Sequence, residues 1–139
     1  CNYLIYNSYN KRISAPRTTK DWLTKDSKIV DTYLADPFCQ FEFTSNGYMN
    51  LFKTIKYTKD MENLKKMPKD LPVLIACGEE DPVGNYGKAA KEVYTMFYEA
   101  GMKDVSLRLY KDDRHELLNE TDSHQIFQDL WQWIYSRII

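Results

Sequence analysis

Two residues with the chemistry of an acid–base pair each follow a short apolar segment of the chain. Asp81 comes shortly after residues 71–77, and His115 comes shortly after residues 105–110. A carboxylate that accepts a hydrogen bond from Nδ1–H fixes the tautomer of a histidine, and the other ring nitrogen can then take a proton from a nucleophile. Residue types and spacing leave a second interpretation open, in which Asp81 caps a turn at Pro82 and His115 is an ordinary loop residue.

The elements around this pair predict an α/β fold. Residues 71–77 form a continuous apolar run that ends at a glycine, which is typical of a strand buried on both faces of a parallel sheet. Apolar residues recur at helical spacing over 86–100, and Gly101 is a suitable residue to end that helix. Residues 105–110 alternate as in a strand, and residues 126–138 form an amphipathic helix. Both Asp81 and His115 are therefore expected at the carboxyl edge of one sheet.

The first half of the chain predicts short helices and long connections, without a convincing strand. Thr18 and Asp21 form a capping-box pattern, which predicts a helix that begins before Trp22. A second helical pattern stops at Asp36, which precedes a proline. Thr44 is a suitable cap for a third helix.

Composition limits the classes of partner. The 139 residues carry a net charge of -1, which gives no general electrostatic reason to bind nucleic acid. The longest apolar run is far shorter than the roughly 20 residues that cross a bilayer, so we expect no transmembrane segment. The three cysteines are widely spaced and form no metal-binding pattern, and they indicate a reducing, cytoplasmic location.

Sequence motifs in the second half of the chain resemble those of a known protein family. The chain resembles the C-terminal part of an α/β-hydrolase of the monoacylglycerol lipase and lysophospholipase branch. The matching stretches are residues 72–84, 105–110 and 114–120, with Trp133 in the closing helix. In that family the aspartate of Gly-x-x-Asp-Pro-Val is the acid of the catalytic triad, and the histidine of Arg-His-Glu is its base. The resemblance therefore implies that Asp81 and His115 are catalytic.

The resemblance extends upstream to residues 19–51, which look like the family's helical cap over the substrate. It implies a cap segment over residues 1–70 and a C-terminal βαβα part of the hydrolase core over residues 71–139. The resemblance makes five aromatic residues candidates for the lining of an acyl-chain channel, although aromatic residues on helices and loops more often pack in the core. They are Phe38, Phe41, Phe43, Tyr48 and Phe52.

The implied function is hydrolysis of carboxylic esters, with lysophospholipids or monoacylglycerols as substrates and no metal or organic cofactor. A lipid substrate would also allow peripheral association with membranes. The alternative to this function is a non-catalytic α/β interaction or binding module related to hydrolases.

Asn119 and Glu120 follow His115 closely in the sequence and are expected to cap the turn after it.

The nucleophile of such an enzyme is missing from the sequence. The triad of α/β-hydrolases runs serine, acid, histidine, with the serine in a Gly-x-Ser-x-Gly turn. Only Ser45 has a glycine two residues later, and no serine has one two residues before it. Cys77 lies at the end of a strand and does not fit the turn.

We therefore expect a C-terminal fragment of a longer hydrolase, an expectation that the start at Cys1 supports. The strand at 71–77 would then have an open edge that favours pairing with another chain. The expected partners are the N-terminal part of the same hydrolase or a second copy of the chain.

Overall fold

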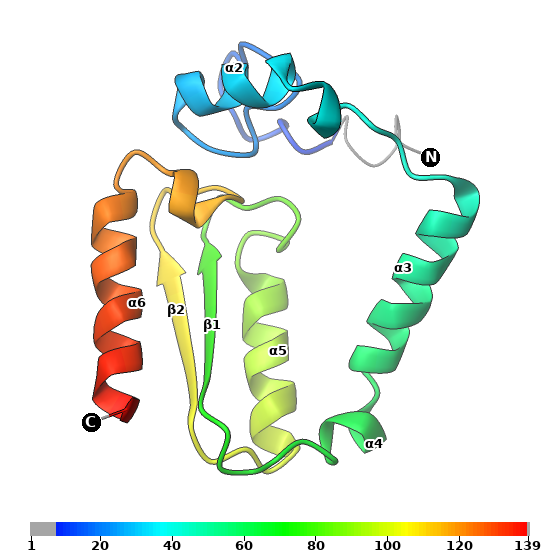
Figure 1. Cartoon of the computed structure of the whole chain (residues 1–139), viewed down its shortest axis with the longest axis vertical. Coiled ribbons are helices and arrows are strands. Elements are labelled where there is room, and N and C mark those ends of the chain that lie inside the picture. Colours follow the sequence, from blue (N-terminus) through cyan, green and yellow to red (C-terminus); the bar gives the residue numbers. More distant parts are fainter. Residues whose placement is uncertain (1–7, 139) are drawn as a thin grey trace.

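The computed structural model describes residues 8–138 of the chain (Figure 1). The described elements, in chain order, are α2 (Ser27–Ala35), the 3-10 turn η1 (Pro37–Cys39), α3 (Ser45–Thr58), α4 (Met61–Leu64), β1 (Val73–Gly78), α5 (Lys88–Glu99), β2 (Val105–Tyr110), the 3-10 turn η2 (Leu117–Asn119) and α6 (Ser123–Ile138). None of the helices within residues 8–138 has the length and apolar character needed to cross a membrane.

Strands β1 and β2 form the parallel pair that the apolar patterns predict. Their register runs from Val73 opposite Val105 to Gly78 opposite Tyr110, and α5 makes the connection between them. The predicted α/β fold class is therefore confirmed, with the carboxyl ends of both strands at the same edge (Figure 1).

The two long helices of the second half contact side chains that alternate along β2. Leu109 lies against Gly87 at the start of α5. On α6, Trp133 donates from Nε1 to Ser106 Oγ at 3.3 Å, and Asp129 pairs with Arg108 at 3.0 Å. Because successive side chains of a strand point to opposite faces, α5 and α6 cover opposite faces of the pair.

Local signals set the helix boundaries in the way expected from the sequence. The N-cap of α3 is Thr44, whose Oγ1 accepts a hydrogen bond from Gly47 N–H at 3.1 Å. Helix α2 ends before Asp36 and the proline that follows it. Gly101 follows α5 with φ at +88°, a left-handed conformation that favours glycine.

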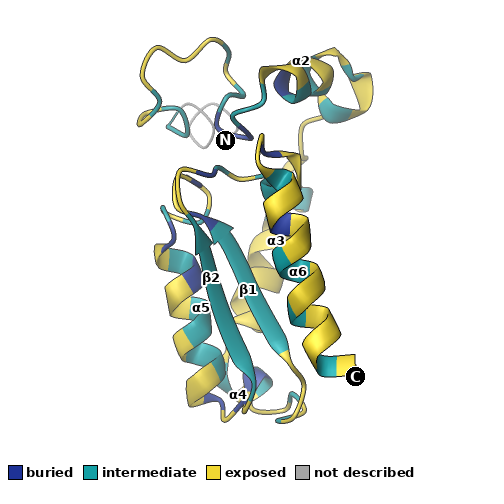
Figure 2. Cartoon of the chain, turned by 90° about the vertical axis from the view of Figure 1, so that its left-hand side faces the viewer, coloured by how far each residue is buried: buried dark blue, intermediate teal, exposed yellow. Residues whose placement is uncertain are grey.

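Burial of the first strand is lower than the apolar run predicts. From Val73 to Cys77 every residue of β1 is half-buried, and only Gly78 is buried (Figure 2). The reason is the size of the sheet, because within residues 8–138 β1 pairs only with β2. Its second edge and much of its surface therefore lack cover from the described part of the chain.

The prediction of a helix that begins before Trp22 is wrong, because the structure has turns there. The side chains of Thr18 and Asp21 do bond to each other, and Asp21 Oδ2 accepts from Thr18 N–H at 3.2 Å, but they close turns rather than a helix. The backbone of the following residues is used elsewhere: Leu23 O accepts from Glu116 N–H at 2.8 Å. Tertiary hydrogen bonds thus replace the helical ones here.

Candidate active site

Asp81 is held rigidly by the turn that follows β1. Its backbone N–H donates to Gly78 O at 3.3 Å, and its own carbonyl accepts from Tyr86 N–H at 2.8 Å. Its Oδ1 accepts from Val83 N–H at 2.9 Å. Only 7% of Asp81 is exposed. The carboxylate therefore has a fixed direction before any ligand binds.

Two glycines allow close packing around Asp81 and the turn after β2. A Cβ on Gly78 would lie 2.3 Å from the carbonyl oxygens of Asp113 and Arg114, so only a hydrogen fits between β1 and the turn after β2. A Cβ on Gly84 would lie 2.9 Å from both Asp81 Oδ2 and Cys77 Sγ. The absence of a side chain at Gly78 thus lets the two loops approach each other, and at Gly84 it leaves room for the Asp81 carboxylate.

The structure brings the Asp81 and His115 side chains together. Nδ1 of His115 lies 3.1 Å from Oδ1 of Asp81, and the two residues are 34 positions apart in the sequence. The His115 side chain is 37% exposed, and its ring lies 5.3 Å from that of Trp22. Within residues 8–138, nothing hydrogen-bonds to Nε2 of His115. That nitrogen is the one that a base would present to a nucleophile.

The electrostatics of the pair favour a protonated imidazole. The hydrogen bond to Asp81 raises the pKa of His115 above its usual 6.5, against the opposing effect of burial, and the charges of Asp81 and Glu116 act in the same direction as the bond. Burial, followed by the charge of Asp81, raises the pKa of the neighbouring Cys77 thiol to about 11. Cys77 therefore remains a thiol at neutral pH, which does not suit a nucleophile.

The backbone around His115 is hydrogen-bonded to residues 22–24, 90 or more positions earlier in the chain. Its N–H donates to Trp22 O at 3.4 Å, and the next N–H, of Glu116, donates to Leu23 O at 2.8 Å. The guanidinium of Arg114 donates to Thr24 O at 3.0 Å. These bonds set the position of the imidazole from the backbone side.

Glu120 caps the end of η2 as predicted, with its N–H donating to Leu117 O at 3.3 Å, and its side chain has a second role. It is 3% exposed, and its Oε1 accepts from Arg114 N–H at 2.7 Å. Its Oε2 accepts from Lys25 N–H at 3.0 Å and from the Thr24 hydroxyl at 3.1 Å. The sequence contains no local signal for this burial, because the donors come from distant segments.

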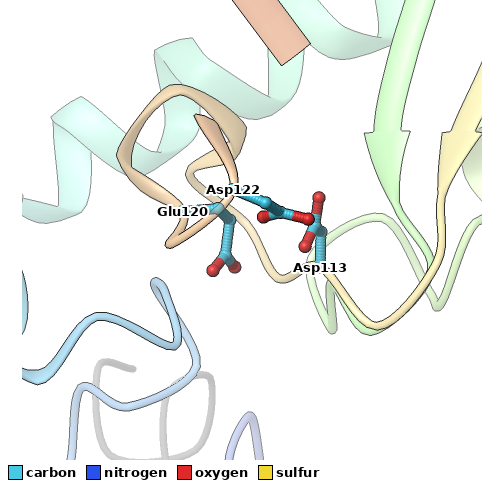
Figure 3. A group of neighbouring side chains, drawn as sticks. All are labelled: Asp113, Glu120 and Asp122. Atoms are coloured by element: carbon cyan, nitrogen blue, oxygen red, sulfur yellow. The ribbon is translucent and has the colours of Figure 1, made fainter. Parts of the chain in front are cut away.

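Three carboxylates near this point could resemble a metal site. Oxygens of Asp113, Glu120 and Asp122 lie within 4.8 Å of one another, and Figure 3 shows Asp113 and Asp122 pointing toward each other. The ammonium of Lys25 forms an ion pair with Asp113 and lies 3.9 Å from Glu120 and 3.7 Å from Asp122. A lysine already supplies the positive charge that such a cluster requires, so we assign it a structural role.

The five predicted channel aromatics divide into two groups. Phe41, Phe43 and Tyr48 line a cavity of about 340 Å³. Phe52 lies outside that lining and stacks on Tyr48 at 6.2 Å between ring centroids, and Phe38 is 86% exposed. Trp22, which sequence reasoning did not select as a site residue, lines the cavity and also contacts His115. The cavity therefore adjoins the histidine through one aromatic ring.

Solved structures share this arrangement of the chain. A highly thermostable carboxyl esterase from Bacillus coagulans, solved in complex with glycerol, is 26% identical and superposes with a TM-score of 0.81 over 99% of this chain and 45% of the esterase. A lipase solved in an open form is 24% identical, with a TM-score of 0.74 over 96% of this chain and 44% of the lipase, and supports the fold alone. The chain thus spans less than half the length of either protein.

No curated protein matches the chain. The sequence profile of the family described as serine aminopeptidase, S33 (Hydrolase_4), matches residues 4–122, which is most of the chain. Together with the parallel βαβ unit and the acid and histidine loops at its carboxyl edge, this match shows that the chain belongs to the S33 serine aminopeptidase-like family of α/β-hydrolases.

Proposed function

We propose that this chain supplies the acid and the base of the catalytic triad of a serine hydrolase that cleaves carboxylic esters, with Asp81 as the acid and His115 as the base. The observation that carries the proposal is the 3.1 Å approach of His115 Nδ1 to Asp81 Oδ1, made by loops that follow adjacent parallel strands. The substrate class that we propose is lysophospholipids or monoacylglycerols.

The proposed reaction uses the two nitrogens of His115 differently. Nδ1–H donates to Asp81, so Nε2 holds the lone pair that takes the proton of the serine hydroxyl as the serine attacks the ester carbonyl. The imidazolium then gives this proton to the leaving alcohol, and a water repeats the cycle on the acyl-enzyme. The Asp81 carboxylate stabilises the imidazolium, in keeping with the raised pKa of His115.

The nucleophile in this proposal comes from outside the chain. The sequence contains no Gly-x-Ser-x-Gly turn, and the chain spans 45% of the esterase that it resembles. We infer that the serine, the donors for the oxyanion and further strands belong to an N-terminal part of the same protein. This part would pair with the open edge of β1. A second copy of the chain is the alternative partner for that edge.

Residues 1–70 are proposed as the cap and residues 71–139 as part of the core. In Figure 1, α2 lies beyond the carboxyl ends of the strands, where a cap would cover a substrate. The cavity lined by Phe41, Phe43 and Tyr48 has a volume within the usual range for small-molecule sites. Cys39 and Cys77 are free thiols, in keeping with a cytoplasmic location, with peripheral membrane association when the substrate is a lipid.

The test measures hydrolysis of aryl and monoacylglycerol esters by the protein that carries this chain together with its nucleophile. We expect His115→Ala to reduce kcat by several orders of magnitude, and Phe41→Ala to change the preferred acyl length. The family's description as aminopeptidases favours one second candidate, an aminoacyl-amide substrate. Hydrolysis of amides but not esters would establish that candidate, and hydrolysis of neither would favour a binding module.

A further inference from the structure

A buried carboxylate that does not contact His115 accepts a hydrogen bond from the backbone of the residue before it. His115 lies on a loop with no regular structure on its N-terminal side, since β2 ends at Tyr110 and η2 begins at Leu117. A side chain on such a loop keeps a catalytic geometry only if the backbone beside it is fixed. Glu120 is a buried charged group whose side chain bonds to this backbone.

The hydrogen bonds of Glu120 join two distant segments. One carboxylate oxygen accepts from the backbone N–H of Arg114, the residue before His115, at 2.7 Å. The other accepts from Lys25 N–H at 3.0 Å and lies 3.1 Å from the Thr24 hydroxyl, whose single proton it shares with Asn119 O at 2.8 Å. A single carboxylate therefore connects the histidine loop to the segment that also carries Trp22.

Charge-assisted hydrogen bonds of this kind are strong when buried. Glu120 is 3% exposed and Thr24 is 1% exposed, so water competes little for these bonds. The ammonium of Lys25, 3.9 Å from Oε2, offsets part of the cost of burying the charge. The bond to Asp81 then only has to orient the imidazole ring.

We propose that Glu120 is a positioning residue for the base His115, acting through the backbone of Arg114 and through residues 24 and 25. This inference rests on the proposed function. The contribution of Glu120 is to the geometry of the reacting nitrogen rather than to substrate binding. Misplacement of a catalytic group by about 1 Å costs on the order of 100-fold in rate.

The experiment uses the protein that carries this chain together with its nucleophile. We expect Glu120→Ala to lower kcat by roughly 10- to 100-fold with KM changed less than twofold. Glu120→Gln should lie between Ala and the wild type, because one amide oxygen still accepts. The acidic limb of the pH profile of kcat/KM should move to lower pH, because a loosened loop weakens the bond that keeps His115 protonated.

Two controls separate positioning from stability and from charge. Arg137→Ala removes an ion pair to Asp104 at the far end of α6 and should lower stability without changing kcat or the pH profile. Glu99→Gln removes an exposed negative charge at the end of α5, away from the histidine loop, and should change neither kcat nor the pH profile.

The outcomes also separate this inference from the proposed function. A loss of activity in Asp81→Asn together with unchanged kcat and pH profile in both Glu120 variants would overturn the role of Glu120 alone. No effect of Asp81→Asn would overturn the triad assignment itself. If Glu120→Ala does not fold, the kcat and pH profile of Glu120→Gln test the role of Glu120.

Discussion

Replacing Gly78 by alanine should move the histidine loop. The added Cβ would lie 2.3 Å from the carbonyl oxygens of Asp113 and Arg114, whereas an ordinary contact begins at 3.4 Å, so the two segments must separate by about 1 Å. Overpacking of this kind costs about 1–3 kcal/mol. The hydrogen bond from Glu80 N–H to Asp113 O, now 2.8 Å, lies at the same point and adds about 1 kcal/mol if lost.

The free energy of unfolding should therefore fall by about 2–4 kcal/mol in Gly78→Ala, which corresponds to a decrease in Tm of roughly 10 °C for a domain of this size. Thermal unfolding followed by circular dichroism measures this. Because His115 directly follows the displaced backbone, kcat/KM should fall on the order of 100-fold in the protein that carries the nucleophile.

Gly101→Ala is the matched control. Gly101 has φ at +88°, and a Cβ there would meet only the Lys69 side chain at 3.9 Å. Alanine should cost about 1–2 kcal/mol through the left-handed backbone alone and leave kcat/KM unchanged. If Gly78→Ala is no less stable and no less active than Gly101→Ala, the close approach of β1 to the histidine loop is refuted.

Three further predictions concern stability. Since the pKa of His115 is raised on folding, its bond to Asp81 stabilises the protein fully below about pH 6.5, and this contribution is lost as pH rises through the raised value. Denaturant unfolding from pH 5 to 9 should show this decline in the free energy of unfolding of the wild type. An equal decline in Asp81→Asn would contradict the prediction. Lys25→Met should lower the free energy of unfolding by about 2–4 kcal/mol in urea titrations, because it leaves buried carboxylates without their cation; a loss below about 1 kcal/mol would contradict this role. Arg137→Ala should lower the free energy of unfolding much less than Lys25→Met in the same assay, since its ion pair with Asp104 lies at the partly exposed surface, and a loss as large as that of Lys25→Met would contradict this.

Local patterns were sufficient to predict the second half of the fold. The apolar run before Gly78 and the alternation over 105–110 are properties of short segments, and both strands form where those patterns lie. The caps Thr44 and Gly101 act within one helical turn, so their effect is visible in the sequence. The proximity of Asp81 and His115 follows from strand order, because adjacent parallel strands end at the same edge.

Other features depend on partners that are distant in the sequence. Residues 22–25 lack the helix predicted from Thr18 and Asp21 because their backbone groups bond to the histidine loop. The burial of Glu120 has the same origin, since Thr24 and Lys25 supply its donors. An aromatic side chain can be expected to be at least partly buried, but its residue type does not predict which cavity it lines.

Nuclear magnetic resonance of the His115 ring tests the central claim most directly. In wild type, long-range proton–nitrogen spectra over a pH titration should show a pKa above 6.5 and, once neutral, a proton on Nδ1. Asp81→Asn should lower this pKa and remove the preference for Nδ1–H, because the charged acceptor 3.1 Å away is gone. A neutral ring protonated on Nε2 in wild type, with a pKa unchanged by Asp81→Asn, would contradict the assignment of Asp81 and His115 as acid and base.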